Sequence, residues 1–180
     1  IQKALSGHYT KIINIGCAEG YYAVGFARAV PGLISLAFDT DVNAQNSCRQ
    51  LAEKNGVSDR VTIGGLFSPD DFAKFENEAA LVFCDIEGAE EELLDPDLAP
   101  ALRKLDIIVE SHECLRKGIT QKLLSRFEAT HTIEVIEDNG SRQLDNPPAW
   151  VTKLSHLDQL LATWEWRSGP TPWLVMNVKN

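Results

Sequence analysis

The stretch IINIGCAEGYYAVGFA, from Ile12 to Ala27, shows the order of strand, turn and helix that recurs along the first two thirds of the chain. An Ile-rich apolar run comes first, a turn with two glycines follows, and a helix-like apolar run ends the unit. Strand-like runs of this kind lie at Lys11–Ile15, Leu33–Phe38, Val61–Ile63, Ala80–Cys84 and Asp106–Glu110. Helix-like segments follow them at Gly20–Val30, Val42–Asn55, Pro69–Asn77, Glu90–Leu105 and Arg116–Glu128, and DPDLAP interrupts the fourth of these. Strand and helix alternating five times predicts an α/β fold with a doubly wound, mostly parallel sheet and helices on both faces.

The last third of the chain departs from this rhythm. HTIEVIED, which starts at His131, reads as a strand, and PWLVMNVKN, which starts at Pro172, reads as another. Between them SHLDQLLATW reads as a helix, with Ser155 and Asp158 spaced as in a capping box. Because no crossover helix directly follows the first of these strands, we expect the two to form an antiparallel hairpin at a sheet edge.

Length and charge restrict the class of protein. A chain of 180 residues that is 44% hydrophobic can bury the core of one α/β domain, so we predict a single domain over residues 1–180. The sequence starts at Ile1 rather than at Met, so we expect further residues upstream. A net charge of −9 argues against binding to nucleic acid or to an anionic membrane, because both depend on clustered Lys and Arg.

The four cysteines do not form a pattern that indicates a metal or a disulfide framework. Cys17, Cys48, Cys84 and Cys114 are widely spaced and contain no CxxC pair. No apolar stretch approaches the ~20 residues that cross a bilayer, and the start of the chain lacks the apolar segment of a secretory signal. We therefore expect a cytoplasmic protein with reduced thiols.

The glycine turn indicates what kind of ligand the domain binds. A dinucleotide fingerprint needs G-x-G-x-x-G, but the corresponding positions here are Gly16, Ala18 and Tyr21. Glu19 would also repel a pyrophosphate at the start of the helix. A turn that needs close backbone approach without phosphate suits S-adenosylmethionine, whose amino group and sulfonium are cationic. Asp39 ends the second strand, near the spacing at which a carboxylate accepts hydrogen bonds from ribose.

Four motifs in order carry a resemblance to a known family. INIGCAEG, LAFDTD, GVSDRVTIGGLF and VFCDIEGAEEELL, within Ile12–Glu113, resemble the class I S-adenosylmethionine-dependent methyltransferases. DIEGAE followed by IIVESHE resembles the FkbM-like branch more narrowly. The resemblance implies a Rossmann-like sheet of seven strands with an antiparallel last strand. Members of this branch often have a small or amide residue where this chain has Ala18-Glu19, which leaves the role of Glu19 open.

The resemblance also implies which residues hold the cofactor. Gly16, Ala18, Gly20 and Asn14 would surround the methionine moiety, Asp39 the ribose, Thr40 or Asp41 the adenosine, Leu66 and Phe67 the adenine, and Asp85 the methionine end.

A second set of polar residues follows the fourth and fifth strands. Asp85 and Glu87 lie in one loop, and Glu110, His112 and Glu113 lie in the next, whereas Glu90 begins a helix, where an acid is favoured by the dipole. His112 is a candidate to accept a proton from a substrate hydroxyl, because its ordinary pKa leaves it mostly neutral at physiological pH. We assign the catalytic role to His112, Glu110 and Asp85.

The same residues could instead hold a divalent cation. Asp85, Glu87, Glu110 and His112 offer oxygen and imidazole ligands that Mg²⁺ or Mn²⁺ would accept, and a cation beside a hydroxyl lowers its pKa. Sequence spacing across two strands does not fix coordination geometry, so this alternative stays open.

These features predict an enzyme that transfers a methyl group from S-adenosylmethionine to a small-molecule acceptor, to an oxygen in preference to a nitrogen. Two alternatives stay open at the level of the sequence. One is an oxidoreductase with an NAD-type cofactor, and the other is a binding module that has a methyltransferase-like fold without catalysis.

Overall fold

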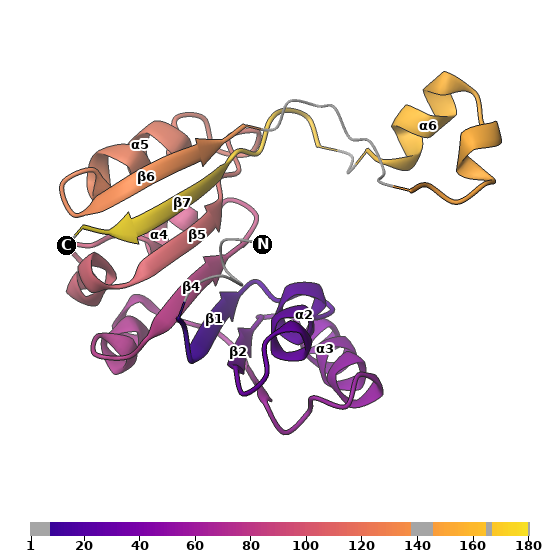
Figure 1. Ribbon diagram of the computed structural model, residues 1–180. Helices are drawn as coiled ribbons and strands as arrows, with labels where there is room; N and C mark the ends of the chain where they lie inside the picture. The colour runs from indigo at the N-terminus through magenta and orange to yellow at the C-terminus, as the bar shows by residue number, and fades with distance from the viewer. Residues whose placement is uncertain (1–7, 138–145, 165–166, 180) are drawn as a thin grey trace.

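A seven-stranded sheet forms the centre of the computed structural model, which describes residues 8–137, 146–164 and 167–179 (Figure 1). The strands run in the order β3-β2-β1-β4-β5-β7-β6. Their bounds are β1 (Lys11–Ile15), β2 (Ile34–Phe38), β3 (Val61–Gly64), β4 (Ala80–Cys84), β5 (Asp106–Glu110), β6 (His131–Ile136) and β7 (Trp173–Val178). β1 to β5 are parallel, and β7 is antiparallel to both β5 and β6. The predicted fold class and the antiparallel edge hairpin are confirmed.

Helices cover both faces of this sheet (Figure 1). The α-helices are α2 (Tyr21–Ala29), α3 (Val42–Lys54), α4 (Glu90–Leu93), α5 (Ile119–Phe127) and α6 (His156–Ala162), and the 3₁₀ helices are η1 (Pro69–Phe75), η2 (Pro100–Lys104) and η3 (Val151–Lys153). The helix-like segment predicted over Glu90–Leu105 is interrupted at DPDLAP, as the sequence indicated. It divides into α4 and η2 because Pro96 and Pro100 lack the N–H that a helix interior needs. No helix among the described residues has the length and apolar character of a membrane span.

Alternate strand residues build the two halves of the core. Ile13 and Val82 point to the face that η1, α4, η2 and α5 cover. Ile12 and Leu81, one position earlier, point to the opposite face and pack with Phe26 of α2. This alternation follows from the period of two in a strand, and it leaves both faces of the central strands buried.

The start of η1 is closed by a reciprocal pair of hydrogen bonds. The Asp71 carboxylate accepts from the backbone N–H of Ser68 at 2.8 Å, and the Ser68 side chain accepts from the backbone N–H of Asp71. Lys74 lies 2.5 Å from the same carboxylate. The hydrogen bonds from Lys74 and Ser68 lower the pKa of Asp71 to about 2.

We expect Asp71→Ala to destabilise the fold by about 1 kcal/mol, the usual contribution of a helix cap. Because the folded pKa of Asp71 is below its unfolded value, the contribution is present at neutral pH and is lost as the pH falls from about 4 to about 2. Urea unfolding at pH 7 and pH 2 measures this difference. An equal difference in stability between variant and wild type at both pH values would contradict it.

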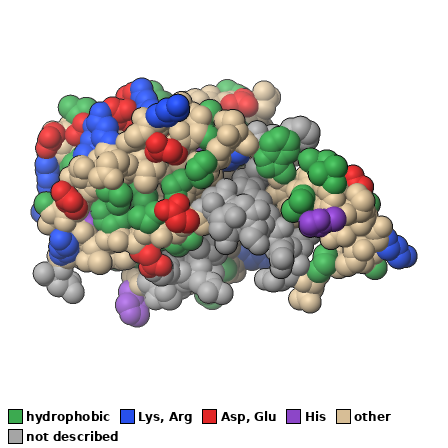
Figure 2. Space-filling view, turned by 90° about the horizontal axis from the view of Figure 1, so that it is seen from above, with side chains coloured by type: hydrophobic (Ala, Val, Ile, Leu, Met, Phe, Trp, Pro, Cys, Tyr) green, Lys and Arg blue, Asp and Glu red, His purple; other side chains and the backbone are tan. Residues whose placement is uncertain are grey.

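Residues 146–164, which lie between β6 and β7 in the sequence, project from the sheet. Figure 1 shows α6 standing away from the body, and none of its residues is buried. Ser155 caps α6 by accepting from the backbone N–H of Asp158, as the sequence predicted. Exposed hydrophobic side chains gather on this projection (Figure 2), and they are Trp150, Leu157, Leu160, Leu161 and Trp164.

Candidate functional site

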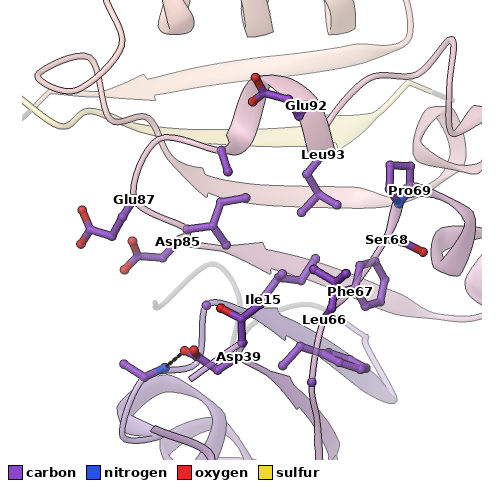
Figure 3. Close-up of a pocket in the computed structure, with 17 residues that line it drawn as sticks. Ile15, Asp39, Leu66, Phe67, Ser68, Pro69, Asp85, Glu87, Glu92 and Leu93 are labelled. Carbon is purple, nitrogen blue, oxygen red and sulfur yellow. Dashed lines mark hydrogen bonds between the residues drawn. The ribbon is translucent and has the colours of Figure 1, made fainter. Parts of the chain in front are cut away.

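A cavity of about 610 Å³ opens at the carboxyl ends of β1, β2, β3 and β4. The chain order reverses on either side of β1, which is where open α/β sheets bind their ligands. Figure 3 shows Asp85 and Glu87 at one end of the cavity and Phe67, Ser68 and Pro69 at the other. The lining residues are Ile15, Gly16, Ala18, Phe38, Asp39, Thr40, Gly65, Leu66, Phe67, Ser68, Pro69, Asp85, Ile86, Glu87, Ala89, Glu92 and Leu93. The volume suits a cofactor-sized ligand.

The glycine turn after β1 forms one wall of the cavity. Gly16 has φ +76°, and a Cβ at this position would lie 1.7 Å from the carbonyl oxygen of Asp85. Only glycine therefore allows the turn after β1 to touch the end of β4. Gly20 has φ +95° and begins α2, and a Cβ there would lie 2.6 Å from the sulfur of Cys48. Gly20 thus permits close packing of α2 on α3 and does not line the cavity.

Asp39 joins the glycine turn to the start of α3. One carboxylate oxygen, Oδ2, accepts from the backbone N–H of Ala18 at 2.9 Å, which Figure 3 marks with a dashed line. The other, Oδ1, accepts from the backbone N–H of Asp41 at 2.9 Å. A carboxylate oxygen has a further lone pair, so each can accept a second hydrogen bond from a ligand. Asp39 is therefore a fixed acceptor on the wall of the cavity.

Aromatic and aliphatic side chains form the far wall. The rings of Phe38 and Phe67 meet edge to face with centroids 4.8 Å apart, and Phe67 packs in the same way on Phe72. Gly64 makes room for this arrangement, since a Cβ there would lie 2.6 Å from the Phe38 ring. Leu66 is 78% exposed beside them, which leaves an apolar surface open to a ligand.

The cavity brings together most of the residues that the sequence indicated for cofactor binding. Seven of them line it, namely Gly16, Ala18, Asp39, Thr40, Leu66, Phe67 and Asp85. Asn14 does not line it, and its amide donates to the backbone carbonyl of Phe83 at 3.4 Å inside the core. Glu19 is exposed at the turn before α2.

A buried histidine lies beside the acidic end of the cavity. His112 is fully buried, and its Nδ1 lies 2.5 Å from Oε1 of Glu90, which is also fully buried. Its other nitrogen, Nε2, lies 3.5 Å from Oδ1 of Asp85 and 3.2 Å from Oε2 of Glu87. Among the described residues, neither Nε2 of His112 nor Oδ1 of Asp85 has a hydrogen-bond partner. We call Asp85, Glu87, Glu90, Glu110 and His112 the acidic cluster.

The charges of the acidic cluster change the pKa values of its own members. Burial and the negative charge of Glu110 raise the pKa of Asp85 to about 7. Burial alone would lower the pKa of His112, but the hydrogen bond to Glu90 and the surrounding carboxylates raise it. Arg167 bonds to Oε2 of Glu87 at 2.8 Å and lies 3.6 Å from Glu110, so it supplies positive charge beside the cluster.

Glu90 and Arg167 are the parts of this arrangement that sequence reasoning missed. Glu90 begins α4, as predicted, but its carboxylate turns inward to hold His112. The signal for this was its place at the end of DIEGAE, beside Asp85 and Glu87. Arg167 follows the projecting segment and has no local motif, so no signal in the sequence places it near β4 and β5.

The sequence matches no protein-family model and no curated protein. Solved structures share the fold. A precorrin-6Y C5,15-methyltransferase from Geobacter metallireducens has a TM-score of 0.64 at 14% identity, over 98% of this chain and 84% of that one. A precorrin 8W decarboxylase from Methanobacterium thermoautotrophicum has a TM-score of 0.61 at 19% identity, over 98% of this chain and 87% of that one. An O-methyltransferase from Bacillus cereus, solved with SAH, has a TM-score of 0.58 at 17% identity, over 94% of this chain and 74% of that one. The chain thus has the fold found in class I S-adenosylmethionine-dependent methyltransferases.

Proposed function

We propose that the protein transfers a methyl group from S-adenosylmethionine to an oxygen of a small-molecule acceptor. The observation that carries this proposal is the pair of acceptor oxygens on Asp39, held on the wall of the cavity by the backbone N–H groups of Ala18 and Asp41. Two hydroxyls on one ribose match such a pair. The apolar wall at Leu66 and Phe67 offers the adenine a surface to lie against, as the family resemblance implies.

The charge of the cavity favours this cofactor over a dinucleotide. Asp39, Asp85, Glu87 and Glu92 line the cavity, and none of its described lining residues is Lys or Arg. The carboxylates of Asp39, Glu87 and Glu92 would repel a pyrophosphate, whereas the sulfonium and ammonium of S-adenosylmethionine are attracted. The structure thus gives a physical reason to prefer a methyl donor to an NAD-type cofactor.

Methyl transfer requires alignment of the acceptor with the methyl group and removal of one proton. The cavity walls would align the cofactor, so that the acceptor oxygen displaces the sulfur in line. The acidic cluster lies at the end of the cavity where Asp85 and Glu87 project (Figure 3), and we assign removal of the proton to its members His112, Glu110 and Asp85. Glu90 orients His112, as an orienting acid does beside other catalytic bases.

The likeness to the FkbM-like branch is part of the same proposal. DIEGAE supplies Asp85, Glu87 and Glu90, and ESHE supplies Glu110 and His112, so the motifs that carry this likeness assemble the acidic cluster. A cytoplasmic location is also proposed, because the four cysteines are all free thiols, as in a reducing compartment.

Calorimetric titration with S-adenosylmethionine, S-adenosylhomocysteine and NAD tests the proposed cofactor. We expect the first two to bind and NAD not to bind. Tight binding of NAD would replace the proposal with an oxidoreductase. Binding of S-adenosylhomocysteine without any methyl transfer to a panel of hydroxylated acceptors would favour a binding module.

A further inference from the structure

Three side chains of the acidic cluster direct their donor atoms at one small space. Nε2 of His112 and carboxylate oxygens of Asp85 and Glu87 all lie within 4.8 Å of one another. They come from the ends of two neighbouring strands, Asp85 and Glu87 after β4 and His112 after β5. Glu110, which the sequence grouped with them, instead lies near Arg167.

The distances match the spacing of ligands around a metal ion. Two donors that each lie about 2.1 Å from an ion are about 3.0 Å apart at a right angle and about 3.4 Å apart at the tetrahedral angle. Nε2 of His112 is 3.5 Å from Asp85 and 3.2 Å from Glu87. Both separations fall close to this range, and neither pair makes a hydrogen bond in the described structure. The donor atoms thus gather around one small space and do not satisfy one another.

His112 gives an independent sign that a ligand belongs at this point. The side chain is fully buried, and its Nε2 is a buried nitrogen that lacks a hydrogen-bond partner among the described residues. A buried polar atom that stays unpaired costs about 1–3 kcal/mol, so such atoms usually have a partner that completes them. Nδ1 on the other side of the ring is held by Glu90. A carboxylate on the far nitrogen is the arrangement that directs a metal-ligating imidazole.

The balance of charge points the same way. Four carboxylates, those of Asp85, Glu87, Glu90 and Glu110, gather around His112, and Arg167 faces two of them. Glu87 is 60% exposed and shares its oxygen between Arg167 and the space in front of His112. Its side chain can therefore turn to a cation without leaving a buried charge unpaired.

We propose that Asp85, Glu87 and His112 bind one divalent first-row transition ion, with Glu90 fixing the imidazole. One nitrogen and two oxygen ligands favour Mn²⁺ or Zn²⁺ over Mg²⁺, which prefers oxygen ligands throughout. Three protein ligands leave positions open for water or for an acceptor hydroxyl. This inference rests on the proposed methyl transfer. It implies that the methyl acceptor is an oxygen compound that can itself coordinate the ion. When the ion is bound, His112 and Asp85 are ligands and not bases, so of the three residues assigned to removal of the proton only Glu110 keeps that role.

Binding of Mn²⁺ to chelator-treated protein tests the site directly. Electron paramagnetic resonance of free Mn²⁺ should show one bound ion per wild-type chain. Glu87→Gln should weaken this binding at least tenfold, because the variant loses a charged ligand at an exposed position that the fold tolerates. Asp85→Asn should have a similar effect. Glu53→Gln, the same change at an exposed position of α3, is the matched control and should bind as the wild type does.

The outcomes separate this inference from the proposed function. No Mn²⁺ binding by the wild type, or equal binding by the wild type and Glu87→Gln, would overturn the metal site. S-adenosylmethionine is titrated in parallel into the chelator-treated protein. Its binding without any Mn²⁺ binding would leave the cofactor proposal intact, whereas Mn²⁺ binding without S-adenosylmethionine binding would leave only the metal site.

Discussion

Asp39→Ala is expected to weaken binding of S-adenosylmethionine about a hundredfold. In the proposed complex the carboxylate offers one oxygen to each of two ribose hydroxyls, and a hydrogen bond to a charged group contributes about 1.5–3 kcal/mol. The loss of two such bonds, about 3 kcal/mol at the lower limit, corresponds to roughly two powers of ten in Kd. The substitution also releases the backbone N–H groups of Ala18 and Asp41, so the turn that forms the cavity wall loses its tie to α3. Calorimetry gives the Kd of each variant.

Two further variants show whether the loss at Asp39 comes from the ribose. Asp39→Asn keeps one acceptor oxygen in place and should fall between the wild type and Asp39→Ala. Asp59→Ala removes an exposed carboxylate in the turn that precedes β3. This turn lies at the amino-terminal ends of the strands, away from the cavity, so the variant should bind S-adenosylmethionine as the wild type does. Equal affinity of Asp39→Ala and the wild type would show that the ribose is held elsewhere.

The fold could be predicted from local pattern because its strands are short apolar runs. β1, β4 and β5 begin and end at the predicted residues, since Gly16 follows β1, Asp85 follows β4, and β5 ends at the charged Glu110. Helix predictions were less accurate where proline intervened. The helix expected at Pro69–Asn77 is the 3₁₀ helix η1, which ends at Phe75 and buries Phe72 and Phe75 in the core.

The site could be predicted in part, because parallel strands bring all their carboxyl ends to one edge. That rule gathered Asp39, Asp85 and His112 from three different strands. It could not tell that Glu90 turns inward, because an acid at the start of a helix already has a sufficient local explanation. The rule also could not distinguish the role of Gly16 from that of Gly20. In the sequence a turn glycine looks the same whether its missing Cβ makes room for the end of a strand or for a helix.

Gly16→Ala is expected to unfold the protein or to lower its free energy of unfolding by about 4 kcal/mol or more, among the largest effects of single substitutions. Two costs add together at this position. An alanine at φ +76° has left-handed backbone strain, and its Cβ would lie 1.7 Å from the carbonyl oxygen of Asp85. The oxygen belongs to the backbone, so no side-chain rotation relieves the clash, and the end of β4 has to move away from β1.

Gly32→Ala separates the two costs, because it carries only the first. Gly32 has φ +81° in the turn before β2, and a Cβ there meets no atom within 4 Å. Its expected loss is the strain alone, roughly 1–2 kcal/mol. Urea unfolding of both variants gives the difference between them, which measures the contact of the glycine turn with the DIEGAE segment. Equal losses at Gly16 and Gly32 would mean that β1 and β4 can separate at little cost, and the glycine turn that forms one wall of the cavity would then be pliable rather than fixed.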